Sequence, residues 1–138
     1  MMVIELLRSN MDNINVLGID YGGKRVGLAI GNLQTKMAFP LKVIENKSYD
    51  FLIAEIKNVC LQENINLIVL GMPEFARDRH SEQYQKTKDF YDKLNTENIG
   101  EVVTEDESFS TQMSDKITKM ADDSNAAAVF LQSFLDKK

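Results

Sequence analysis

The chain has 138 residues, 43% of them hydrophobic, and a net charge of −5. This is the size of one globular domain with a substantial core. No apolar run approaches the roughly 18 residues of a membrane span, and the N-terminal residues lack the basic start and long apolar stretch of a secretory signal, so we expect a cytoplasmic protein. The acidic balance argues against nonspecific coating of nucleic acid, which depends on many cationic contacts with phosphate. It does not exclude a local nucleic-acid site.

The segment NVLGIDYGGKRVGLAIGN, residues 15–32, predicts two strands joined by a tight turn. Two runs rich in Val, Ile and Leu flank residues 21–24, and the paired glycines of that turn suit antiparallel strands. A third strand is expected at about 37–44. Pro40 within it favours an edge position or a bulge, because proline cannot donate to a strand ladder.

A helix is expected next, because Ser48 can cap its N-terminus and apolar residues recur at helical spacing, at Leu52, Ile56 and Val59. The run NLIVLGMP is typical of a central strand covered on both faces, ending at Gly71. The single cysteine, Cys60, shares the apolar helical spacing. It is therefore predicted to be a buried thiol rather than a reactive or metal-binding one, and it has no partner for a disulfide within the chain.

A second helix is expected from Ser81, with a packed face formed by Tyr84, Thr87, Tyr91 and Leu94. EVVTED is predicted to be the last strand, followed by a helix over about 111–138 with a break near 121–124. This order predicts an α/β fold with a mixed sheet, whose first three strands are antiparallel and whose later strands are parallel, with helices on its faces. Residues 1–13 are expected to be a loosely attached extension, and residues 14–138 a single domain.

Carboxylates occur at three sequence-distant places that this topology brings toward one edge of the sheet. Asp20 ends the first strand, the run TEDES follows at 104–108, and Asp122 and Asp123 begin the last helix. The plain alternatives are an N-cap role for the two helix-start acids, and ordinary solvation for the loop acids Glu105, Asp106 and Glu107. Carboxylates that converge would suit Mg²⁺ or Mn²⁺, hard cations that support phosphodiester cleavage.

Several cationic or titratable residues could contact phosphates near these acids, namely Lys24, Arg25, Arg77, Arg79 and His80. His80 is the only histidine, so a multi-histidine zinc site and a catalytic dyad with Cys60 have little support. An ordinary surface position is the alternative for His80. The sequence contains neither GxxxxGK[ST] nor GxGxxG, so P-loop and Rossmann nucleotide sites are not indicated.

Four segments, in order, resemble the YqgF family, also called RuvX, of pre-16S ribosomal RNA nucleases related to Holliday-junction resolvases. GIDYGGKRVGLAIGN is similar to the family's D-x-G-x-(K/R)-R-(I/V)-G-(V/L)-A, and VLGMPEF to its strand ending in G-(L/M)-P. DESFST is similar to D-E-R-(L/F)-(S/T)-T, and DDSNAAAVFLQSFLD to the closing helix. The resemblance spans about residues 15–136. It implies an RNase H-like fold, with a five-stranded mixed sheet flanked by helices.

The resemblance also implies roles for single residues. It assigns Asp20, Glu107 and Asp123 as catalytic carboxylates that hold Mg²⁺ or Mn²⁺, and it matches Arg25 to the family's arginine. Three positions match its glycines: Gly22, Gly27 and Gly71. Two departures from the family concern the substrate. Ser108 stands where the family has an arginine, which removes a cation that could pair with phosphate or with the acids. The loop after G-M-P, which often contains glycine in the family, is here FARDRHSEQ and carries extra cations.

Three functions compete at this point. The first is a metal-dependent nuclease that acts on the 5′ extension of precursor 16S ribosomal RNA or on a branched DNA junction. A nuclease that resolves junctions would have to be a symmetric dimer, because it needs two active sites facing two strands. The sequence does not distinguish a monomer from a homodimer. V-L-G-I-D-Y-G-G also resembles the phosphate loop of sugar kinases and actin-like ATPases, but those proteins clamp ATP between two such domains and this chain has room for one. The third is a catalytically silent nucleic-acid-binding module.

Overall fold

The computed structural model of the protein describes residues 13–72, 81–106 and 123–138. The elements in these residues follow the predicted order. They are β1 (Asn15–Tyr21), β2 (Arg25–Asn32), β3 (Met37–Glu45), α2 (Tyr49–Gln62), β4 (Leu67–Met72), α3 (Glu82–Thr96), β5 (Glu101–Asp106) and α5 (Asp123–Asp136). Of the predicted extension, residues 1–13, only Asn13 lies within the described residues. The segment 111–122 of the predicted last helix lies outside them.

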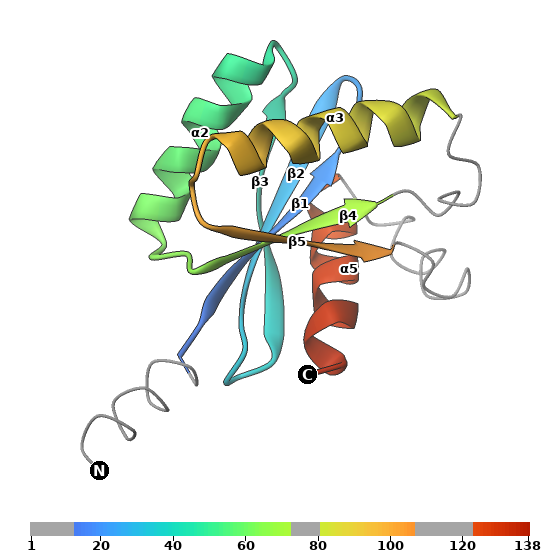
Figure 1. The fold of residues 1–138 in the computed structure, drawn as a ribbon. Coiled ribbons are helices and arrows are strands. Elements are labelled where there is room, and N and C mark those ends of the chain that lie inside the picture. Colours follow the sequence, from blue (N-terminus) through green and yellow to red (C-terminus); the bar gives the residue numbers. More distant parts are fainter. Residues whose placement is uncertain (1–12, 73–80, 107–122) are drawn as a thin grey trace.

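The five strands form one mixed sheet in the order β3-β2-β1-β4-β5. β1 pairs antiparallel with β2, and β2 with β3, while β4 pairs parallel with both β1 and β5. Helices α2 and α3 cover one face of the sheet and α5 covers the other (Figure 1). The predicted mixed sheet with three antiparallel opening strands is confirmed.

Both expectations for Pro40 are confirmed. β3 is an edge strand, so the missing N–H of the proline interrupts no inner ladder. The pairing with β2 shifts register beside it: Leu28 faces Lys42, whereas the next residue, Ala29, faces Pro40. This bulge leaves one residue of β3 without a partner in the ladder.

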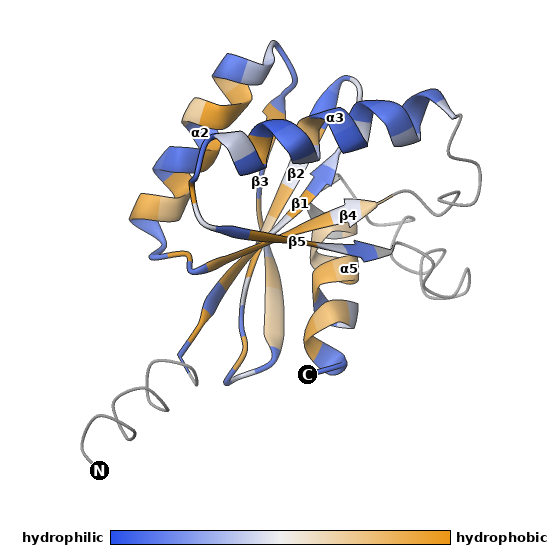
Figure 2. Cartoon of the chain, viewed as in Figure 1, coloured by the Kyte–Doolittle hydropathy of each residue, from blue (hydrophilic) through white to orange (hydrophobic). Residues whose placement is uncertain are grey.

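Alternation along the central strands divides the core into two layers. Figure 2 shows that hydrophobic residues are concentrated in the central strands and in α2 and α5. On β1, Leu17, Ile19 and Tyr21 face α2 and α3, whereas Val16 faces α5. β4 is apolar on both faces because it lies inside the sheet. The two helices begin as predicted: the Ser48 hydroxyl accepts the Phe51 N–H at 3.1 Å, and the Ser81 hydroxyl accepts the Tyr84 N–H at 3.2 Å.

The predicted packed face of α3 is partly wrong. Thr87 and Leu94 are buried, but the large core residue is Phe90, which is fully buried, while Tyr84 and Tyr91 are only half-buried. The Phe90 ring stacks on Tyr21 of β1, with centroids 4.5 Å apart. The helical period allows either the stripe that contains Tyr91 or the one that contains Phe90 to face the sheet. The stacking of Phe90 on Tyr21 selects the second stripe.

Cys60 is half-buried rather than fully buried. It packs at the margin of the core formed with α2 and α3, and burial raises the pKa of its thiol to about 11. Desolvation of the thiolate supports the prediction that this thiol is unreactive. No described helix is long and apolar enough to cross a membrane.

Candidate active site at the carboxyl end of β1

Asp20 lies near the end of β1, on the sheet face that α5 covers. Its neighbours Ile19 and Tyr21 point into the core under α2 and α3, so the period of two along a strand directs Asp20 to the opposite face. The residue is half-buried. An acid in an inner strand is thus accommodated because its carboxylate stands at the rim of the sheet rather than in the middle of a core layer.

Glycines lie on both sides of Asp20. Gly27 of β2 is its direct partner, and extending the β1–β4 register by one residue from Ile19 and Leu70 places Gly71 on the other side. Because a glycine has no side chain, neither neighbouring strand fills the space beside the carboxylate on this face. Gly27 and Gly71, both predicted as structural glycines, are thus the two strand neighbours of the acid.

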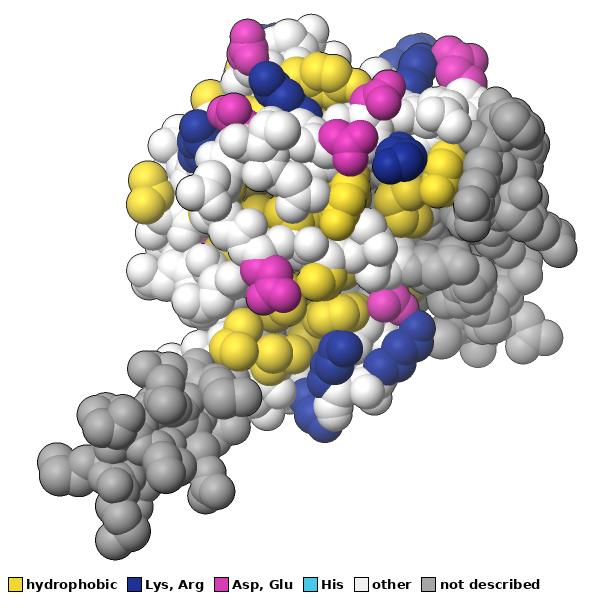
Figure 3. All heavy atoms as spheres, in the orientation of Figure 1, with side chains coloured by type: hydrophobic (Ala, Val, Ile, Leu, Met, Phe, Trp, Pro, Cys, Tyr) yellow, Lys and Arg dark blue, Asp and Glu magenta, His cyan; other side chains and the backbone are white. Residues whose placement is uncertain are grey.

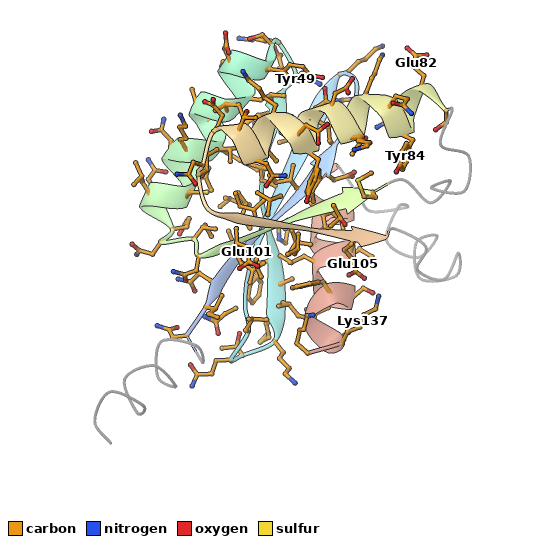
Figure 4. All side chains as sticks on the ribbon, viewed as in Figure 1. Tyr49, Glu82, Tyr84, Glu101, Glu105 and Lys137 are labelled. Atoms are coloured by element: carbon orange, nitrogen blue, oxygen red, sulfur yellow. The ribbon has the colours of Figure 1, made fainter. Side chains whose placement is uncertain are left out.

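Glu105 continues this row across the sheet. It is paired with Gly71 in the β4–β5 ladder, so its backbone lies two strand spacings from Asp20, or about 10 Å. Glu105 belongs to β5, and its side chain is only 11% exposed and forms an ion pair with Lys137, the residue directly after α5; Figure 4 labels both side chains. The alternative that treated Glu105 as a solvated loop acid is therefore wrong.

Helix α5 brings its N-terminus toward the same end of the sheet, the carboxyl end of β1. A Cβ added at Gly18 would lie 3.1 Å from the Cβ of Leu131, and one at Gly31 would lie 2.9 Å from Cδ1 of Leu135. Gly31 is the β2 partner of Val16, near the start of β1. The helix therefore runs antiparallel to β1, and its first residue, Asp123, lies toward the end of β1 that carries Asp20.

The turn after β1 presents two of the predicted phosphate contacts. Lys24 and Arg25 are both exposed. The turn itself is tight: a Cβ added at Gly22 would lie 2.5 Å from the carbonyl oxygen of Arg25, whereas one at Gly23 would meet nothing within 4 Å. Neither glycine has a positive φ. Gly22 is thus required for close approach, and the pairing of glycines does not serve a left-handed turn.

Two residues that the sequence did not single out hold this turn. The side-chain amide of Gln83 donates to the carbonyl of Tyr21 at 3.0 Å, and that of Asn46 donates to the carbonyl of Gly22 at 2.8 Å. These residues lie 62 and 24 positions away from their acceptors, so no local pattern indicates them.

The remaining predicted site residues are not placed in the same detail. Glu107, Arg77, Arg79 and His80 lie outside the described residues, and α5 includes Asp123 without a described side chain. Within the described part of the chain, no three His, Cys, Asp or Glu side chains gather as potential metal ligands. The structure therefore places Asp20, the basic turn and the start of α5 at one edge, and the assignment of three metal-holding carboxylates stays a prediction.

One described cavity lies elsewhere. It has a volume of about 270 Å³ and is lined by residues such as Asn15, Asn32 and Phe39. Asn15 is the first residue of β1, at the opposite end of the strand from Asp20. This cavity is therefore not part of the candidate active site.

Comparison with known sequences identifies a family. The model of the family described as "RuvX: Holliday junction resolvase" matches residues 14–137. A protein of Orientia tsutsugamushi (strain Ikeda) named "Putative pre-16S rRNA nuclease" is 30% identical over 145 aligned positions, covering 98% of this chain and 92% of the relative. A protein of Fusobacterium nucleatum with the same name is also 30% identical, covering 88% of this chain and 96% of the relative.

Solved structures agree on the fold. A structure of Thermus thermophilus RuvC matches with a TM-score of 0.59 at 14% identity, covering 90% of this chain and 95% of that chain. The fowlpox virus Holliday junction resolvase matches with a TM-score of 0.56 at 15% identity, covering 91% of this chain and 100% of that chain. These likenesses confirm the predicted RNase H-like fold. With the family match over residues 14–137, they lead to one conclusion: the chain belongs to the RuvX family.

Proposed function

We propose that this protein is a divalent-metal-dependent nuclease that hydrolyses phosphodiester bonds, with the 5′ extension of precursor 16S ribosomal RNA as its substrate. The observation that carries the proposal is the position of Asp20. Its carboxylate stands at the end of a central strand, between glycines on both neighbouring strands, at the edge toward which α5 directs its N-terminus. The membership of the RuvX family and the names of the relatives support the reaction class.

The chemistry of the donor set fits Mg²⁺ or Mn²⁺. Asp20, Glu107 and Asp123 would supply carboxylate oxygens, which hard divalent cations prefer. A cation held there supplies charge that activates water and stabilises the leaving oxygen of a phosphodiester. The position of Asp20 supports this assignment, because neither flanking strand has a side chain at the positions beside its carboxylate on the α5 face.

The basic turn gives the substrate an orientation. Lys24 and Arg25 follow Asp20 on the adjoining strand and turn, and both are exposed, so they can contact the phosphate backbone beside the scissile bond. In the hydrolysis we propose, the oxygen of a water molecule bonds to phosphorus and the bond from phosphorus to the 3′ oxygen breaks. The 3′ oxygen receives a proton, which leaves a 5′-phosphate and a 3′-hydroxyl.

A branched DNA junction is the second candidate substrate. The description of the matching family names a Holliday junction resolvase, and this observation favours the alternative. Cutting two strands of a junction symmetrically requires two active sites related by a twofold axis, hence a homodimer. Processing of precursor ribosomal RNA does not require a homodimer. A protein with that function would act in the cytoplasm.

The test is cleavage of a structured RNA carrying a 5′ extension of 16S ribosomal RNA, and of a four-way DNA junction, with Mg²⁺ or Mn²⁺ at low salt. We expect RNA cleavage that excess chelator abolishes. Asp20→Asn should reduce it by at least about 100-fold, since loss of a metal ligand should exceed the 10- to 100-fold effect of groups that only support ligands. Asp92→Asn, a change of the same kind at an exposed position of α3, is the matched control and should cleave like the wild type.

The outcomes separate the candidates. Cleavage that survives Asp20→Asn in a folded protein, or that persists in chelator, contradicts the metal-carboxylate mechanism. Preferential cleavage of the junction by a dimer would identify branched DNA, and not RNA, as the substrate. Binding of either substrate without cleavage, by wild-type protein with cooperative thermal unfolding, identifies the binding module instead.

A further inference from the structure

The segment that follows Asp20 is held from outside its own hairpin. Gln83, on the first turn of α3, donates through Nε2 to the carbonyl of Tyr21 at 3.0 Å. Asn46, in the connection between β3 and α2, donates through Nδ2 to the carbonyl of the next residue, Gly22, at 2.8 Å. Two side-chain amides from different elements therefore hold two consecutive carbonyls directly after the proposed metal ligand.

The Gln83 side chain is itself held in place. Gln83 Nε2 donates to the hydroxyl of Thr87, one helical turn further along α3, at 3.3 Å. The same hydroxyl donates to the backbone carbonyl of Gln83 at 2.8 Å. Thr87 is 1% exposed. The ring of Tyr21 stacks on Phe90 of the same helix, so α3 contacts Tyr21 through both its carbonyl and its ring. The position of Tyr21 is thus set by α3.

Asn46 holds the other part of the turn. Besides the contact of its side chain with Gly22, its backbone N–H donates to the carbonyl of Lys24 at 2.9 Å. The two contacts span the tight approach of Gly22 to Arg25. The connection between β3 and α2 therefore determines how the basic turn is presented.

We propose that Gln83 and Asn46 are positioning residues of the nuclease reaction, an inference that rests on the proposed function. Gln83 fixes the peptide between Tyr21 and Gly22, one residue beyond Asp20, and thereby holds the end of β1 that orients the carboxylate at the metal site. Asn46 fixes the turn that carries Lys24 and Arg25 and thereby orients the phosphate contacts. Neither residue touches the substrate or the metal. Groups that orient a metal ligand in this way typically affect activity or metal affinity 10- to 100-fold.

This division predicts different kinetic effects for the two residues. Gln83→Met keeps the length of the side chain but removes its donor, so kcat should fall by about 10- to 100-fold, with a matching rise in the Mn²⁺ concentration that gives half-maximal rate. KM for the RNA should stay near the wild-type value. Asn46→Ala should instead raise KM, and should reduce the slope of log affinity against log salt by about one, because one phosphate contact is lost.

The matched control is Gln62→Met. It makes the same change at an exposed position at the end of α2, which lies by the start of β1 because the carbonyl of Glu63 accepts from Asn15 at 3.3 Å. Thermal unfolding of each variant is measured beside its kinetics. We expect all three variants to unfold cooperatively, and only Gln83→Met and Asn46→Ala to change the kinetics.

The failure of this inference differs from the failure of the proposed function. An active wild type, together with Gln83→Met and Asn46→Ala variants that match Gln62→Met in kcat, KM, metal dependence and salt slope, overturns the positioning roles alone. Loss of activity that merely follows loss of thermal stability, with kcat and KM both unchanged below the unfolding transition, also overturns them. A folded wild type that cleaves no substrate with either metal overturns the proposed function and the positioning roles together.

Discussion

Gly22 and Gly23 are adjacent, yet the structure predicts opposite outcomes for the same substitution. A Cβ at Gly22 would lie 2.5 Å from the carbonyl oxygen of Arg25, closer than real Cβ atoms approach backbone oxygens. The obstacle is backbone, so relief requires the turn itself to move. Overpacking of this kind costs about 1–3 kcal/mol, against a gain of about 0.4–1 kcal/mol from the smaller entropy of the unfolded alanine chain. We therefore expect Gly22→Ala to be destabilised by about 1–2 kcal/mol.

Gly23→Ala is the internal control. Its Cβ would meet nothing within 4 Å, and its φ is not positive, so the change should be neutral or slightly stabilising. Urea unfolding monitored by circular dichroism measures both variants, and a cleavage assay on the same samples reports whether the displaced turn also slows the reaction. Equal unfolding free energies for the two variants would refute the assignment of Gly22 to close approach rather than to a left-handed turn.

Two further predictions concern the core under α2 and α3. Burial raises the pKa of Cys60 to about 11 from 9.0, which leaves about 100-fold less thiolate near pH 8 than an ordinary thiol has. Alkylation of the native protein by iodoacetamide should therefore be slow, and its rate should rise about tenfold per pH unit up to pH 10. A native rate equal to the rate in urea would contradict this prediction. Phe90→Ala should lower the unfolding free energy by about 3–5 kcal/mol, plus about 0.5–1.5 kcal/mol for the lost stack on Tyr21. Tyr91→Ala, at the neighbouring half-buried position, should lower it clearly less, and equal losses in urea unfolding would show that the predicted Tyr91 stripe was right after all.

Local patterns were sufficient for most of the fold. Each of these patterns predicted an element that the structure contains: the Val-, Ile- and Leu-rich runs VLGID and RVGLAIG, the cap at Ser48 with the apolar spacing after it, the spacing from Ser81 onward, and the apolar run before Gly71. These signals work because strand composition, helical spacing and helix capping depend on residues within a few positions of one another. The order of strands and helices then restricted the topology to a mixed sheet.

The candidate site was predicted less completely. Asp20 could be recognised because an acid after four apolar or small residues has few structural explanations, and the family resemblance added Glu107 and Asp123. Glu105 could not be interpreted from sequence, because an acid at the end of a strand looks the same whether it is solvated or paired with a lysine 32 positions away.

The sequence by itself thus determined the elements and their order through short-range spacing, and it singled out the acid at the end of the first strand through its position and a motif resemblance. Tertiary structure alone decided which stripe of α3 faces the sheet, why Gly22 is a glycine, and that Gln83 and Asn46 hold the turn beside Asp20. The first and the last depend on contacts between segments far apart in the chain, whereas Gly22 is constrained by the carbonyl of Arg25, three residues later in the same turn. Such long-range contacts are set by strand register and helix rotation, which no local period encodes.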